Sequence, residues 1–241
     1  MFTRPIAAAG LFLLSACGRE DGTSPTGARV DSIVTEDAGA SAAPSAAEAP
    51  LRAELTGRSR EISNPDGFTM VLLYYSLAGG QPPVDKWVEE HLSVGSARPI
   101  DKPAARDALR AKIASGLAAM KDVGAIRLSM NAGLSEFDPF YNEYTVRAFA
   151  PSSEIQFHDL GEQVGIKFDN AQKAQRWNLD PAQSQAIRDR IPYSSDVAVD
   201  ALLKLTGTTP DAVGGTINAD VVEYELKSQR AGTTIAKVKV K

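Results

Sequence analysis

The chain has 241 residues, 26 lysines and arginines against 30 aspartates and glutamates, and a formal net charge of −4 at pH 7. This mildly acidic balance, with no cluster of basic residues, argues against nucleic-acid binding and against electrostatic docking on anionic lipid. One cysteine and two histidines, with no H-x-H or H-x-x-x-H spacing, argue against a disulfide framework and against a histidine-rich zinc site.

Residues 1–16 have the three parts of an export signal. Arg4 supplies the positive charge, Ile6 to Leu14 is an apolar run, and Ser15 and Ala16 are the small residues that a signal peptidase requires. The run is much shorter than the roughly 20 residues with which a helix crosses a hydrocarbon core of ~30 Å. We therefore expect a cleaved signal peptide over residues 1–16, and no permanent transmembrane helix.

Leu14-Ser15-Ala16-Cys17 contains the only cysteine of the chain. It resembles the lipobox of bacterial lipoproteins, in which the thiol is diacylated and the chain is cut before the cysteine. The resemblance implies lipidation of Cys17 and anchoring of the mature protein in the cell-envelope membrane, since two acyl chains give stable anchoring. Gly18, where an aspartate favours the inner membrane, implies the outer membrane with the domain in the periplasm. The alternative is an ordinary secretory signal with an incidental cysteine.

The segment after Cys17 has the composition of a flexible linker. Ala, Ser, Thr, Gly, Pro and acidic residues dominate, and no aromatic residue occurs between Cys17 and Phe68. Such a segment cannot bury enough apolar area to offset its conformational entropy. We predict a lipidated cysteine and disordered tether over residues 17–60, followed by a single domain over residues 61–241. The alternatives are a segment that folds on a partner and a short helix over Arg52–Arg60.

The first part of the predicted domain has helical patterns. The apolar run Phe68–Leu77 predicts a short buried helix, although periodicity alone does not exclude a buried strand. Asp85–Leu92 predicts a second helix. Pro103–Lys121 is the clearest helix, because Pro103 fits a first turn, Asp101 can cap it, and an apolar stripe follows at helical spacing.

After these helices the apolar period changes to two, which is typical of half-buried strands. A hairpin is expected to close the chain, and short helices around residues 171–177 and 181–190 interrupt the strands. The order predicts an α+β fold with N-terminal helices followed by a mainly antiparallel sheet, sandwich-like or partly closed, with a short helical insertion. The predicted strands are Ile126–Met130, Tyr144–Ala148, Val164–Phe168, Val197–Leu205, Thr216–Leu226 and Thr233–Val240.

The acidic and aromatic run from Glu136 to Tyr144 is the most unusual stretch of the domain, in what should be a loop between strands. Carboxylate oxygens suit calcium, but no EF-hand spacing exists and we predict no metal. Aromatic rings on a loop suit recognition of a partner or a sugar. The alternative is a long hairpin turn whose aromatic rings fold back onto the core. The predicted partner or ligand surface consists of Glu136, Asp138, Phe140, Tyr141 and Glu143.

Other chemical signals are weak. His158, with Asp159 and Glu162, would suit an acid–base or metal site, but the same residues suit a plain turn between strands. His91 fits a surface position, and Trp177 fits the core. The sequence has no G-x-S-x-G, no G-x-x-x-x-G-K-[ST] and no G-x-G-x-x-G after a strand, so we predict no catalytic residue and no cofactor.

These observations predict a membrane-anchored, non-enzymatic lipoprotein that binds or scaffolds another envelope component, a protein or part of the cell wall. The domain resembles uncharacterised lipoproteins of the Gram-negative envelope. One alternative is a carboxylate-dependent hydrolase of cell-wall or glycan substrates, in which two acids share a cleft. Another is a carrier of a small ligand or lipid, which predicts a deep apolar cavity.

Overall fold

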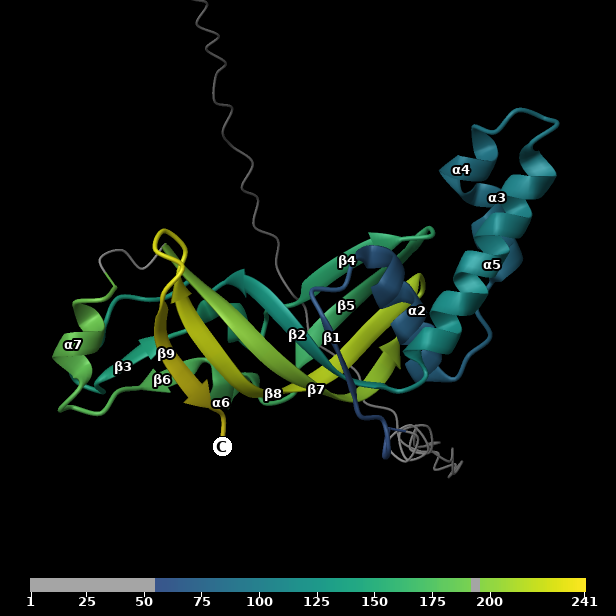
Figure 1. Cartoon of the computed structure of the whole chain (residues 1–241). Helices are drawn as coiled ribbons and strands as arrows, with labels where there is room; N and C mark the ends of the chain where they lie inside the picture. The colour runs from purple at the N-terminus through teal and green to yellow at the C-terminus, as the bar shows by residue number, and fades with distance from the viewer. Residues whose placement is uncertain (1–54, 192–195) are drawn as a thin grey trace, which may run out of the picture. The chain divides into compact units, whose positions relative to one another are not determined.

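The computed structural model describes residues 55–191 and 196–241 (Figure 1). The lipobox, Cys17 and most of the predicted tether lie outside the described residues. The first described segment, Leu55–Gly57, forms a turn, and Arg60 already begins the first strand. Residues 55–60 are therefore not part of the short helix considered above.

The predicted helices are present, but a strand precedes them, so the expectation of helices first is wrong. Strand β1 (Arg60–Ser63) pairs in parallel with a strand that follows the helices. The second predicted helix ends early, because His91 is extended and its ring accepts a hydrogen bond from the Ser93 amide. Asp101 occupies the N-cap position of the long helix, as predicted, but its carboxylate pairs with Arg98 at 2.6 Å and makes no capping hydrogen bond. The four helices are α2 (Gly67–Ala78), α3 (Val84–Glu90), α4 (Leu92–Gly95) and α5 (Lys102–Met120).

Seven strands of the described chain form one sheet in the order β1-β2-β7-β8-β5-β4, with β9 paired to β8. Two short strands, β3 (Glu143–Thr145) and β6 (Arg176–Asn178), form a second sheet. The short helices α6 (Ala171–Ala174) and α7 (Ser184–Arg188) flank β6. The other strands are β2 (Val123–Asn131), β4 (Ile155–Asp159), β5 (Glu162–Phe168), β7 (Val197–Pro210), β8 (Gly214–Ser228) and β9 (Thr234–Lys239).

The fold is α+β, as predicted, but the large sheet is mixed. The pairs β1–β2 and β5–β8 are parallel, whereas β2–β7, β7–β8, β8–β9 and β4–β5 are antiparallel. Alternation along one strand shows which face is buried but does not identify the neighbouring strand, so the sequence did not reveal the parallel pairs. The sandwich-like or partly closed form of the sheet stays a prediction.

Two predicted elements near the small sheet are wrong. The strand predicted over Tyr144–Ala148 ends at Thr145, and the 3₁₀ helix η1 (Arg147–Phe149) follows. Tyr144, Val146 and Phe149 are all buried, which a strand with only one covered face cannot achieve because its side chains alternate between faces. Trp177, predicted on a helix, lies in β6 and stacks on Tyr144 with ring centroids 5.4 Å apart. Its predicted place in the core is confirmed, since Trp177 is buried.

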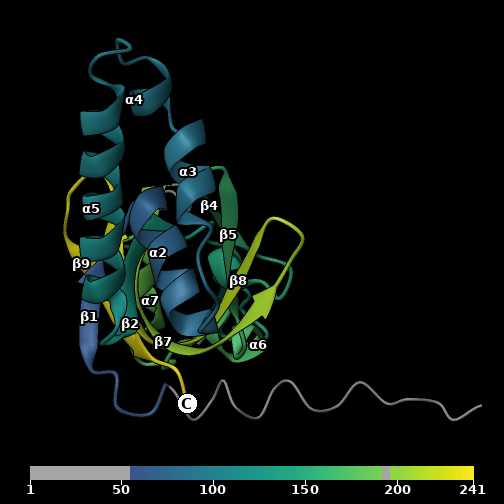
Figure 2. The same ribbon diagram turned by 90° about the vertical axis from the view of Figure 1, so that its right-hand side faces the viewer.

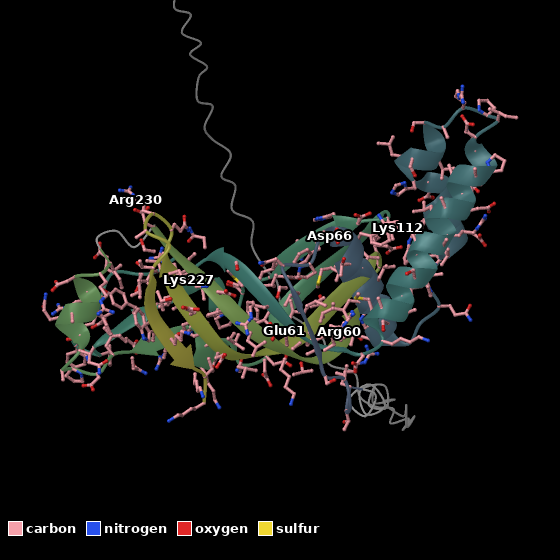
Figure 3. All side chains as sticks on the ribbon, viewed as in Figure 1. Arg60, Glu61, Asp66, Lys112, Lys227 and Arg230 are labelled. Carbon is pink, nitrogen blue, oxygen red and sulfur yellow. The ribbon has the colours of Figure 1, made fainter. Side chains whose placement is uncertain are left out.

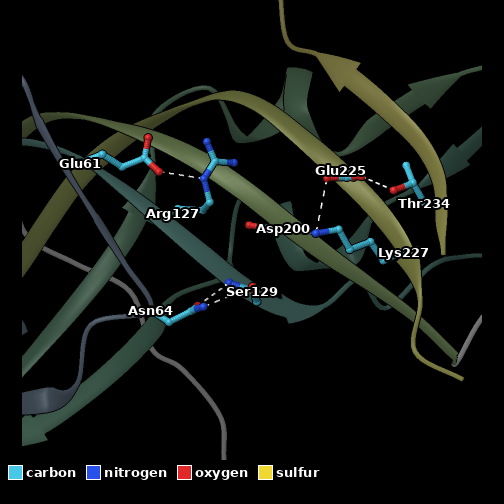
Figure 4. A network of polar contacts seen from close by, with 8 residues as sticks. All are labelled: Glu61, Asn64, Arg127, Ser129, Asp200, Glu225, Lys227 and Thr234. Carbon is cyan, nitrogen blue, oxygen red and sulfur yellow. Dashed lines mark hydrogen bonds and ion pairs between the residues drawn. The ribbon is translucent and has the colours of Figure 1, made fainter. Parts of the chain in front are cut away.

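One face of the large sheet carries polar pairs, which explains the alternation in the sequence. On β1 and β2, Glu61 accepts a hydrogen bond from Arg127 at 2.8 Å (Figure 4). Farther along the sheet, Lys227 of β8 lies between Asp200 of β7 and Glu225, at 3.1 and 3.4 Å. Asp200 is the main cause that raises the pKa of Lys227. These contacts keep the polar face of the strands paired while the opposite face packs on the core.

Helix α2 is the centre of the core. It contacts α5 and also β4, β5, β7 and β8, and α3 and α5 stand beside it (Figure 2). At its first turn Asp66 accepts a hydrogen bond from the Thr69 amide at 2.8 Å. The Thr69 side chain, followed by this amide, lowers the pKa of Asp66. Lys112 of α5 lies near this turn, 4.2 Å from the centre of the Phe68 ring (Figure 3). The buried side chains of α2 are Met70, Val71, Leu72, Leu73, Tyr74 and Leu77.

Two glycines allow the close packing of α2. A Cβ on Gly116 of α5 would clash with the Leu72 side chain. A Cβ on Gly215 of β8 would lie 2.5 Å from both the Tyr74 hydroxyl and the Thr209 carbonyl oxygen. The rigid tyrosine ring and the strand backbone cannot both move away, so only glycine fits at position 215.

We expect Gly215→Ala to destabilise the domain by about 1–3 kcal/mol, because the added methyl overfills a packed site. Gly207→Ala is the matched control, since a Cβ on Gly207 of β7 meets no atom within 4 Å. It should change the free energy of unfolding by less than about 0.5 kcal/mol. Denaturant unfolding of both variants measures the difference. Equal stability of the two variants would contradict the close approach of Tyr74 to β8.

Candidate functional site

The predicted loop between Glu136 and Tyr144 is a short turn whose backbone is held by hydrogen bonds. Asp138 and Glu143 form an antiparallel bridge, in which each amide donates to the other residue's carbonyl oxygen at 2.9 and 3.2 Å. The Asp138 carboxylate accepts hydrogen bonds from the amides of Phe140 at 2.8 Å and of Tyr141 at 3.2 Å. The side chain of Asp138 therefore holds the backbone of the turn in one shape.

Two aromatic rings project from this turn. Phe140 is 84% exposed and Tyr141 is 65% exposed, and their rings meet edge to face with centroids 4.8 Å apart. The next residue, Asn142, is in the left-handed region and is tied to Leu179 by two hydrogen bonds. Hydrogen bonds therefore hold the backbone on both sides of the two exposed rings.

The alternative, in which the aromatic rings fold back onto the core, holds only for part of the run. Phe137 packs against Tyr144, with ring centroids 5.3 Å apart, and Arg188 covers the Phe137 ring at 4.7 Å. Phe140 and Tyr141 do not pack on the core and are exposed to solvent. Glu136 is exposed as well. Within the described residues, no group of three or more acidic, histidine or cysteine side chains is placed to hold a metal ion.

His158 and Glu162 lie on the β4–β5 hairpin but do not form a common site. Leu160 and Gly161 make the two-residue turn, with φ of 53° and 75°, so the plain-turn alternative is confirmed. His158 is exposed and lies opposite Gln163 in the ladder, whereas Glu162 is buried. Adjacent ladder positions face opposite sides of the sheet, which separates the imidazole from the Glu162 carboxylate.

The structure reveals a second candidate, which we call the Glu162 pocket. Glu162 is only 7% exposed and accepts a hydrogen bond from the indole Nε1 of Trp87 at 3.1 Å. It lines a cavity of about 450 Å³, a size typical of small-molecule sites. The cavity is lined by Tyr74, Tyr75, Ala78, Gly80, Lys86, Glu162, Thr208, Pro210, Asp211, Ala212, Val213 and Gly214.

The parallel pairing of β5 with β8 builds this pocket. Gln163 lies beside Gly214, so the beginning of β5 meets the hairpin that joins β7 to β8. The end of α2 lies above the same point, because Gly215 leaves room for Tyr74. Helix α3 contributes Lys86 to the lining, and its Trp87 donates the hydrogen bond to Glu162. The pocket therefore combines four segments that are distant in the sequence.

Burial and the nearby carboxylates raise the pKa values of both tyrosines of the pocket, Tyr74 and Tyr75. Burial, followed by the negative charge of Glu162, raises the pKa of Tyr75 to about 12. Burial also raises the pKa of Tyr74, with further contributions from Glu162 and Asp211. Both phenols therefore remain protonated at neutral pH and can donate hydrogen bonds.

Sequence reasoning did not single out the pocket, although one signal pointed to Glu162. Val164, Ile166 and Phe168 occupy the buried face of β5, and Glu162 falls on the same face by the period of two. A carboxylate in such a register is unusual, since buried acids require partners. The neighbouring glycine pair Gly214-Gly215 begins β8.

A scan against protein-family models found no match, and searches of curated proteins and of solved structures also found none. Among the described residues, no helix has both the length and the apolar character needed to cross a membrane.

The raised pKa values of the buried tyrosines predict that the domain loses stability at high pH. A phenol in the unfolded chain titrates near pH 10, whereas burial raises the pKa of Tyr224 and raises that of Tyr75 to about 12. Because the unfolded chain releases its phenolic protons first, this stability is fully present below about pH 10 and is lost as the pH rises towards 12.

Urea unfolding between about pH 9 and pH 12 measures this loss. Tyr75→Phe should make the decline shallower, because one of the shifted phenols is removed. Tyr141→Phe is the matched control, since it removes an exposed hydroxyl and should leave the slope unchanged. Identical slopes for Tyr75→Phe and the unaltered chain would show that Tyr75 titrates like a free phenol.

Proposed function

We propose that this protein is a membrane-anchored lipoprotein of the cell envelope whose domain binds or scaffolds another envelope component without catalysing a reaction. The lipobox around Cys17 supports the anchor, and Gly18 supports the outer membrane, with the domain in the periplasm. The composition of residues 17–60 supports a flexible tether between the two.

The observation that carries the binding proposal is the exposed pair of Phe140 and Tyr141 on a constrained turn. Exposed aromatic rings contact a partner with large apolar area and little loss of conformational entropy, and such rings dominate binding energy in many interfaces. Asp138 holds the turn before any partner binds, which reduces the ordering cost further. We propose that these rings, flanked by Glu136 and Glu143, contact an envelope protein or a cell-wall component.

The two alternatives receive less support. For a carboxylate-dependent hydrolase, the acids named from the sequence would have to face one cleft, but Asp138 instead accepts hydrogen bonds within its own turn. For a carrier of a small ligand or lipid, a deep apolar cavity would have to lie against the sheet, and the Glu162 pocket is lined by the charged residues Glu162, Asp211 and Lys86 as well as by apolar ones. The space between α2 and the sheet is instead occupied by large, fully buried side chains such as Met70, Leu73 and Ile217.

The anchor is tested by Cys17→Ser. We expect the variant to leave the membrane fraction, because without acyl chains the apolar anchoring energy of about 0.8 kcal/mol per buried methylene is lost. Fractionation of cells that express either chain measures the change. Glu61→Gln, a substitution on the domain surface, is the control and should stay in the membrane fraction. Continued sedimentation of Cys17→Ser with membranes would refute the lipid anchor.

The partner surface is tested by a photocrosslinking amino acid in place of Tyr141 in the full, anchored chain. We expect one discrete crosslinked species in native envelope, which Phe140→Ala reduces at least about tenfold, as is usual for a central aromatic contact. The control position is Leu92 of α4, which is 80% exposed but lies on another part of the surface. Crosslinks of equal pattern from both positions would indicate contact by chance and would contradict the proposed surface.

A further inference from the structure

The Glu162 pocket contains a buried carboxylate that forms no ion pair with a lysine or arginine of the described residues. The Glu162 carboxylate is 7% exposed and accepts a hydrogen bond from the neutral indole of Trp87 at 3.1 Å, and the neutral phenol of Tyr75 also interacts with it. Among the described residues, none of the ion pairs between a basic and an acidic side chain includes Glu162. A buried carboxylate without a cationic partner is costly to stability, and such groups concentrate at functional sites.

The walls of the pocket favour a ligand that is cationic at one end and apolar along its length. Tyr74 and Tyr75 contribute aromatic surface, and the hairpin between β7 and β8 contributes the half-exposed side chain of Val213. Asp211 adds a second carboxylate, and the charges of Asp211 and Glu162 both act on Tyr74. Aromatic rings and carboxylates together attract organic cations through the ring quadrupole and through direct ion pairing.

The balance of charge excludes the other simple ligand classes. Two carboxylates, Glu162 and Asp211, face the cavity against one lysine, Lys86, which is exposed at the rim. An anion would be repelled by this balance, and a neutral ligand would leave Glu162 without a counter-charge. A primary ammonium has three N–H donors, for which the Glu162 and Asp211 carboxylates and the Thr208 hydroxyl are available acceptors.

We propose that the Glu162 pocket binds the primary ammonium group of a small organic amine, with Glu162 as the main counter-charge and Tyr74, Tyr75 and Val213 around its carbon chain. This site is separate from the Phe140–Tyr141 turn and from the lipid anchor, so it goes beyond the proposed function. Failure of either proposal leaves the other standing.

The test is an NMR titration of the full chain, purified in a non-ionic detergent, with n-butylammonium. The chain has two tryptophans, and the indole N–H of Trp87 donates to Glu162, so its resonance reports directly on the pocket. Trp177, buried beside Tyr144, is an internal control. We expect a saturable shift of the Trp87 signal alone. 1-Butanol, which has the same size and no charge, should give no saturable shift at the same concentrations.

Three variants decide the role of charge. Glu162→Gln keeps an acceptor for Trp87 and should weaken binding of n-butylammonium at least about tenfold, as expected for loss of a buried ion pair. Glu61→Gln is the matched control, because it removes the same charge from β1, at the opposite end of the strand order from β5 and β4, and should leave the affinity unchanged. Lys86→Gln should strengthen binding, because it removes the cation at the rim.

The proposal is overturned if n-butylammonium gives no saturable shift, if 1-butanol binds equally well, or if folded Glu162→Gln binds the amine as tightly as the unaltered chain. Should Glu162→Gln lose its dispersed indole signals through unfolding, Asp211→Asn and Lys86→Gln decide instead. The first must weaken binding and the second must strengthen it, and any other result rejects the ammonium site.

An ammonium group can come from a free amine or from the lysine side chain of a peptide. Titration with Nα-acetyl-lysine methylamide separates these sources, because the flanking amides of a peptide either fit at the rim of the pocket or clash there. Tighter binding of this compound than of n-butylammonium assigns the group to a lysine side chain, and weaker binding assigns it to a free amine. Both outcomes support the ammonium site.

Discussion

The packing of α2 is the constraint on which the rest of the domain depends. This helix is apolar on all sides, so it must be covered all round, by α5 on one side and by β4, β5, β7 and β8 on the other. Such coverage requires short distances between backbones, and Gly116 and Gly215 provide them by having no side chain where Leu72 and Tyr74 approach. The helix therefore determines where the large sheet and the helical layer meet, and with them the position of the Glu162 pocket.

The two candidate sites both depart from the usual distribution of side chains, in opposite ways. At the turn after Asp138, two aromatic rings are exposed to water although the nearby rings of Phe137, Tyr144 and Trp177 pack together. In the pocket, a carboxylate is buried among aromatic residues. Exposed apolar rings and buried charges cost stability, and proteins retain such departures mainly where function requires them. This shared cost is the physical reason to regard both places as binding sites.

Much of the secondary structure could be predicted, because helices and strands reflect periods within short segments. The apolar run Phe68–Leu77 and the stripe after Asp101 correspond to α2 and α5, and the alternating segments correspond to β2, β5, β7, β8 and β9. The predictions were wrong where tertiary contacts override the local pattern. Around Tyr144–Phe149 a 3₁₀ turn replaces a strand, because Tyr144, Val146 and Phe149 must all reach the core.

The sequence by itself determined the signals that act without a fold, namely the lipobox pattern at Cys17, the composition of the following segment, and the position of the aromatic run around Phe140 and Tyr141. Only the tertiary structure decided which rings of that run are exposed, because Leu179 and Arg188 come from a distant segment. It also decided the existence of the Glu162 pocket. The pocket needs the parallel pairing of β5 with β8, and register between distant strands depends on the whole packed sheet rather than on the period within any one strand.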